Sequence, residues 1–137
     1  MKYLLDTHVV LWMAQNSPLL SLAAKQAILD KQSQKYVSIV SAWEVAIKLG
    51  TGKLRLEGGL DEFFRIINEN GLIVLNIEPA YLQAIQFLPF WHKDPFDRIL
   101  ITTASVENLT LISADENIPK YDVIPICKNN LTRSPFS

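Results

Sequence analysis

The chain has 137 residues, of which 49% are hydrophobic and 20% are charged, and its formal net charge is −1. This length and composition are typical of one globular domain with a sizeable core, so we expect a single domain over residues 1–137 and exclude a disordered or low-complexity protein. A net charge near zero gives no general affinity for nucleic acids, so a polyanionic partner would need a local basic patch or a bridging metal ion.

The cysteine content and the hydropathy pattern predict where the protein resides. Cys127 is the one cysteine in the sequence, which excludes an internal disulfide and a cysteine-based zinc cluster. Asp6 and His8 interrupt the apolar residues near the start, which is unlike a signal peptide. No run approaches the roughly 20 apolar residues of a membrane span. We therefore expect a cytoplasmic protein that does not enter the membrane.

The predicted elements alternate between strands and helices. The first is a short strand at Tyr3–Leu5, whose continuous apolar run indicates that helices cover both of its faces. Further strands are predicted at 36–40, 72–75, 109–112 and 123–126, and helices at 9–12, 22–31, 41–49, 60–70, 79–88 and 97–106. Alternation of this kind implies parallel pairing and right-handed crossovers. The sequence therefore predicts an α/β fold, a three-layer α/β/α sandwich around a five-stranded parallel sheet.

Four acidic residues fall where a predicted strand gives way to a helix: Asp6, Glu44, Asp97 and Asp115. Because the carboxyl ends of parallel strands meet at one edge of a sheet, and ligands of open α/β sheets bind along that edge, we expect these four carboxylates to converge. Each also has a local structural interpretation, because acids are favoured at helix N-termini. Ser41 and Glu44 have the spacing of a capping box, and Asp6 could cap the helix that follows it.

Four adjacent carboxylates predict a metal ion. Like charges raise one another's pKa values, so the cluster requires a compensating cation. Ligation by oxygen alone, without a cysteine or histidine cluster, favours Mg²⁺ or Mn²⁺ over zinc. Such an ion lowers the pKa of a bound water and polarises a phosphoryl oxygen, which is the chemistry of phosphodiester hydrolysis.

Four segments in this order, residues 4–8, 38–48, 92–101 and 111–115, resemble the successive motifs of the PIN domain, and most closely those of VapC-type toxins from bacterial toxin–antitoxin pairs. The resemblance covers nearly the whole chain, and its most specific part is the Asp-Pro-Phe-Asp-Arg sequence at 94–98. It implies a metal-dependent endoribonuclease with a five-stranded parallel sheet. It also implies an RNA substrate, a homodimer, and a cognate antitoxin whose tail covers the site.

The resemblance also implies roles for individual residues. The catalytic and metal-binding acids carry over as Asp6, Glu44, Asp97 and Asp115, whereas Asp94 is interpreted as a helix cap. Three hydroxyl residues are candidates for orienting these carboxylates or their waters: Thr7, Ser41 and Ser113.

Two basic residues, Lys48 and Arg98, are candidate RNA contacts. The alternatives are structural: Lys48 would belong to a solvated helix end, and Arg98 would pair with Asp94.

Three other functions are compatible with clustered acids. A receiver-like regulatory module also holds Mg²⁺ beside a phosphorylatable aspartate, but the chain lacks an obvious acceptor lysine on a late strand. A structure-specific DNA nuclease of the same fold would use the same acids. An interaction protein with vestigial catalysis is the third alternative.

Overall fold

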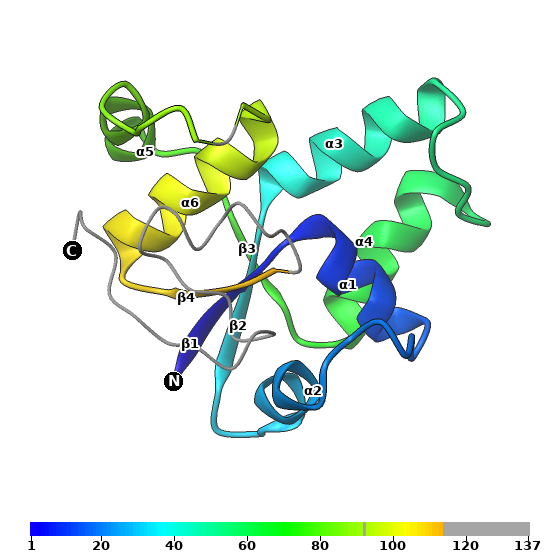
Figure 1. Cartoon of the computed structure of the whole chain (residues 1–137). Helices are drawn as coiled ribbons and strands as arrows, with labels where there is room; N and C mark the ends of the chain where they lie inside the picture. Colours follow the sequence, from blue (N-terminus) through cyan, green and yellow to red (C-terminus); the bar gives the residue numbers. More distant parts are fainter. Residues whose placement is uncertain (92, 114–137) are drawn as a thin grey trace.

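The computed structural model describes residues 1–91 and 93–113. Its strands and helices alternate along the chain as the sequence predicts (Figure 1). In chain order they are β1 (Lys2–Leu5), α1 (Thr7–Ala14), α2 (Leu22–Leu29), β2 (Gln34–Ser38), α3 (Ile39–Gly50), α4 (Gly59–Glu69), β3 (Ile73–Leu75), α5 (Pro79–Ile85), α6 (Pro95–Glu107) and β4 (Thr110–Ile112).

The four strands form one parallel sheet in the order β3-β2-β1-β4. β1 is therefore central, with Leu5 opposite Val37 of β2 on one side and Ile112 of β4 on the other. This confirms the predicted parallel α/β fold, with four strands in the described part of the chain. The predicted fifth strand, at 123–126, lies outside the described residues.

Helices pack on both faces of the sheet, which gives the predicted three layers (Figure 1). Tyr3 and Leu5 face one core, which they share with residues of α1, α2 and α4. Leu4 faces the other core, where Leu100 of α6 and Leu111 of β4 pack against it. Because both faces of β1 are covered, its buried residues Tyr3–Leu5 form an uninterrupted apolar run.

The start of α3 differs from the prediction and changes the role of two residues. The helix begins at Ile39, and the Ser38 hydroxyl caps it by accepting from the Val40 amide at 3.1 Å. The strand predicted at 36–40 is therefore wrong at its end, where β-branched residues enter the first helical turn instead. Ser41 is consequently inside the helix and Glu44 lies in its second turn, so the capping-box interpretation of this pair is wrong.

Other helix ends follow local sequence signals. Ser21 caps α2 by accepting from the Ala24 amide at 3.1 Å, and α4 is followed by Gly71 with a left-handed φ of 66°. α2 and α5 end two and three residues before their predicted ends, at Leu29 and Ile85. Among the described residues, no helix has both the length and the apolar character needed to cross a membrane.

Candidate functional site at the carboxyl edge of the sheet

Asp6 lies at the centre of the sheet edge, directly after β1. Its amide donates to the carbonyl of Ile112 at 3.1 Å, which extends the β1–β4 pairing by one bond. Its Oδ1 accepts from the Val9 amide at 2.8 Å, so the residue is also the N-cap of α1. The side chain is buried, with 5% of the residue exposed. Capping fixes the orientation of this carboxylate and leaves its second oxygen for other contacts.

Glu44 is held between α1 and α3. The Thr7 hydroxyl donates to Glu44 Oε1 at 2.6 Å, and the Lys48 ammonium lies 2.8 Å from Oε2. The Glu44 side chain is only 7% exposed, whereas that of Lys48 is 33% exposed. Both carboxylate oxygens therefore have a partner, one from the neighbouring helix and one from the solvent side.

The Glu44 carboxylate is close enough to Asp6 to influence the ionisation of the Asp6 carboxyl. Burial raises the pKa of the Asp6 carboxyl above its ordinary value, and the negative charge of Glu44 raises it further. Hydrogen bonds from the Ser113 hydroxyl and the Val9 amide act in the opposite direction and lower this pKa, as does nearby His8. The structure thus brings Asp6, Glu44, Thr7 and Ser113 together.

Asp97 lies in the first turn of α6, and the described residues do not bring it into one group of three metal-ligating side chains with Asp6 and Glu44. Asp94 caps this helix, with its Oδ1 accepting from the amides of Phe96 and Asp97 at 2.8 and 3.2 Å, so its predicted capping role is confirmed. Phe96 packs edge-on against Trp43 of α3, with ring centroids 5.1 Å apart. The first turn of α6 therefore lies beside the start of α3, and half-buried Asp97 belongs to that turn.

The carboxylates at this edge offer few ligands for a divalent cation. Within residues 1–91 and 93–113, no three histidine, cysteine, aspartate or glutamate side chains are close enough to share one ion; Asp115 lies outside the described residues. The Asp6–Glu44 pair supplies two buried carboxylates. Ser41 Oγ is, in the described part of the chain, the one buried side-chain oxygen without a hydrogen-bond partner. Two buried carboxylates fit Mg²⁺ or Mn²⁺, which bind through few protein carboxylates and keep several waters.

Arg98 has a structural position that the sequence does not reveal. Its guanidinium donates to the carbonyls of Leu88 and Pro89 at 3.0 and 2.9 Å. The ring of Phe90 covers it at 4.1 Å, and the residue is 5% exposed. Its guanidinium therefore binds the loop that precedes α6, which corrects the predicted pairing with Asp94 and leaves little of the side chain for RNA.

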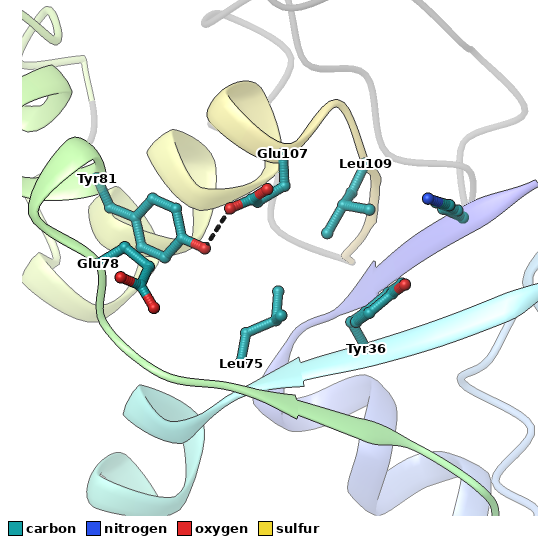
Figure 2. Close-up of a pocket in the computed structure, with 7 residues that line it drawn as sticks. Tyr36, Leu75, Glu78, Tyr81, Glu107 and Leu109 are labelled. Carbon is teal, nitrogen blue, oxygen red and sulfur yellow. Dashed lines mark hydrogen bonds between the residues drawn. The ribbon is translucent and has the colours of Figure 1, made fainter.

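A separate cavity of about 340 Å³ lies between α5, α6 and the sheet (Figure 2). The Tyr81 hydroxyl donates to the Glu107 carboxylate across it at 2.6 Å. Burial and this hydrogen bond raise the pKa of the Tyr81 phenol, so it remains a neutral donor that joins α5 to α6. The lining includes Lys2, the first residue of β1, and the last residue of α6. Because Asp6 follows the other end of β1, we assign this cavity no part in the carboxylate site.

The Lys48–Glu44 ion pair is the feature of the site that the sequence interpretation missed. The signal is a glutamate four residues before a lysine on one helix, a spacing that places the two side chains on the same face. Lys48 therefore has a partner inside the site rather than a solvated helix end.

The sequence profile of the PIN domain family matches residues 3–124. Among solved structures, the chain is similar to VapBC2 from Rickettsia felis bound to a promoter DNA fragment, with TM-score 0.68, 15% identity, and coverage of 91% of this chain and 96% of that one. It is also similar to VapBC-1 from nontypeable Haemophilus influenzae, with TM-score 0.62, 17% identity, and coverage of 99% and 98%. A toxin–antitoxin complex from Klebsiella pneumoniae gives TM-score 0.57, 20% identity, and coverage of 82% and 86%. No curated protein matches the chain.

Proposed function

Because the chain belongs to the PIN domain family, we propose that it is a metal-dependent endoribonuclease and the VapC-type toxin of a toxin–antitoxin pair. The observation that carries this proposal is the buried pair of carboxylates, Asp6 and Glu44, at the carboxyl edge of the parallel sheet. A buried carboxyl group whose pKa is raised by burial and by a neighbouring carboxylate, as for Asp6, is typical of sites that bind a cation.

In this proposal Asp6, Glu44, Asp97 and Asp115 hold Mg²⁺ or Mn²⁺. A bound ion of this kind supplies a water of lowered pKa and stabilises charge on the phosphoryl group. Thr7 and Ser113 orient the first two carboxylates through the hydrogen bonds described above. Ser41 Oγ is buried and unpartnered among the described residues, and in this proposal it donates to a water of the ion. Attack by water leaves a 5′-phosphate and a 3′-hydroxyl, so the chain needs no nucleophile of its own.

We also propose that the protein is cytoplasmic and has a protein antitoxin as its partner. The likeness to VapBC complexes supports the antitoxin. The absence of an overall positive charge is consistent with RNA binding through the metal ion and a few basic residues such as Lys48.

A second copy of the chain is the other proposed partner. An apolar groove of about 210 Å³ lies between α3, α5 and α6. Its lining includes Trp43 and Leu82, which are 59% and 52% exposed in the single chain. A contiguous apolar surface of this kind favours a homodimer through this face.

The test of the nuclease is a pair of substitutions, Asp6→Asn and Asp97→Asn, assayed on labelled RNA with Mg²⁺ or Mn²⁺ and again with EDTA. Each variant is expected to lose at least about 100-fold in cleavage rate, because one carboxylate ligand is removed while the fold is kept. Asp61→Asn, which makes the same change on an exposed face of α4, is the control and should cleave like the wild type.

Circular dichroism of each variant establishes that the fold is retained. Wild-type cleavage rates in either Asp6→Asn or Asp97→Asn, or full activity in EDTA, would contradict the proposal. Labelled single-stranded and flap DNA, assayed in parallel, distinguish the DNA nuclease alternative. Mass measurement after incubation with a small phosphodonor tests the receiver alternative, which requires a gain of one phosphoryl group.

A further inference from the structure

The ammonium of Lys48 occupies the side of Glu44 that faces solvent. Lys48 lies one turn after Glu44 on α3, and its Nζ is 2.8 Å from Glu44 Oε2. The opposite oxygen, Oε1, accepts from the Thr7 hydroxyl, which comes from the buried side of the carboxylate. A second cation that approached Oε2 would therefore meet the lysine first.

A divalent ion and the ammonium compete for this oxygen. Both are cations, and their mutual repulsion at a few ångströms is strong where the surroundings are partly buried. The buried hydroxyl of Thr7 fixes Oε1, so the carboxylate cannot easily turn to offer its other oxygen. Binding of a metal at Oε2 thus requires the ammonium to leave.

We propose that Lys48 is a positioning residue that takes the place of the metal ion in the metal-free site and is displaced when the ion binds. This inference rests on the proposed function, because it assumes that Glu44 is a metal ligand. In the metal-free protein the lysine neutralises Glu44 beside Asp6 and holds the Glu44 side chain in its buried orientation. It thereby lowers the affinity of the site for the metal.

Solvent beside Glu44 can accept the displaced Lys48 ammonium. The Lys48 side chain is 33% exposed and has a flexible four-carbon stem, so the ammonium moves into solvent without unpacking the helix. There it remains beside the carboxylate edge, where the phosphate of a bound RNA would arrive. The same residue therefore stabilises the empty site and presents a positive charge to the substrate once the site is loaded.

The test compares Mn²⁺ binding by isothermal titration calorimetry in the wild type, Lys48→Met and Lys48→Arg. Lys48→Met keeps most of the stem and removes the competing charge, so it is expected to bind Mn²⁺ about three- to tenfold more tightly. Lys48→Arg retains a cation and should bind like the wild type. Lys31→Met removes the same charge from an exposed turn before β2 and is the matched control, with unchanged affinity.

Thermal unfolding in EDTA is the second measurement. Lys48→Met should melt at a lower temperature than the wild type without metal, and should gain more from added Mn²⁺ than the wild type gains. Lys48→Gln serves in the same assays if the methionine variant does not fold. Equal or weaker Mn²⁺ affinity on removal of the charge overturns the inference.

The two proposals fail in different ways. Suppose that Asp6→Asn abolishes Mn²⁺ binding while Lys48→Met binds Mn²⁺ no more tightly than the wild type. The proposed metal site is then supported and the proposed role of Lys48 is wrong. If neither the wild type nor Lys48→Met binds Mn²⁺, and RNA cleavage persists in EDTA, the metal-dependent function itself is wrong and this inference falls with it.

Discussion

Asp6 combines a structural role with a charge that the fold opposes. As the N-cap of α1 it satisfies the Val9 amide, which a neutral asparagine would do equally well. The fold does not favour the negative charge of Asp6. Burial and the neighbouring charge of Glu44 both raise the pKa of its carboxyl, which disfavours the ionised form. The residue is therefore well suited to hold a cation and costs stability when none is bound.

Because the buried charge of Asp6 lowers the stability of the metal-free protein, we predict that the free energy of unfolding depends on pH. Because the folded pKa of Asp6 exceeds its ordinary value of 3.8, the folded protein binds this proton more tightly than the unfolded chain does. The stabilising contribution is complete below pH 3.8 and is lost as the pH rises through the folded pKa. Asp6→Asn is neutral at every pH, so in EDTA near neutral pH it should melt a few degrees above the wild type, equivalent to roughly 1 kcal/mol.

The measurement is thermal unfolding by circular dichroism at several pH values, with EDTA present. The advantage of Asp6→Asn should shrink as the pH is lowered toward that ordinary value, because the wild-type carboxyl is then neutral too. Asp61→Asn, which is exposed, should show no such trend. A variant that is less stable than the wild type at neutral pH would show that the charge is not opposed by the fold.

Among the elements, local sequence signals determined the helix starts at Ser21 and Asp94, and both caps form as predicted. They failed at α3, where β-branched Ile39 and Val40 indicate a strand but the Ser38 cap begins a helix. Nothing local distinguishes these outcomes, because the packing of α3 against the sheet decides between them. The destination of the Arg98 guanidinium is likewise unpredictable, since it binds carbonyls about ten residues earlier in the chain.

The N-terminus of α6 provides a test that separates two neighbouring aspartates. Asp94→Ala removes the cap of the helix and should lower the free energy of unfolding by about 1 kcal/mol, whereas Asp94→Asn should change it by only a few tenths. Urea denaturation measures both. Asp94→Asn should also cleave RNA at the wild-type rate, unlike Asp97→Asn. Loss of cleavage in Asp94→Asn with unchanged stability would place Asp94 in the site instead.

At the scale of the whole molecule, the strand order brings together residues that are far apart in the sequence. From the sequence alone, acids that follow parallel strands are predicted to converge, since parallel strands end at one edge. The described structure places Asp6 and Glu44 together and brings the first turn of α6 beside α3. The ion pair at Lys48 and the unpartnered Ser41 hydroxyl depend on side-chain packing, which spacing alone does not specify.

The proposed homodimer is tested at its apolar groove. Leu82→Glu places a charge in this surface and should convert a dimer, about twice the chain mass of 15.5 kDa, into a monomer. Size-exclusion chromatography with light scattering measures the mass. Leu22→Glu, on the exposed side of α2, is the control and should leave the dimer intact. A wild-type monomer, or a Leu82→Glu dimer, would exclude this face as the interface.

The hydrogen bond from the Asp6 amide to the carbonyl of Ile112 has a consequence for protein synthesis. Asp6 is synthesised more than 100 residues before β4, the strand that flanks it on one side, is complete. A nascent or truncated chain that stops before β4 contains Asp6 and Glu44. It lacks the strand whose Ile112 carbonyl accepts from the Asp6 amide. Assembly of the acidic edge therefore waits until β4 has been synthesised.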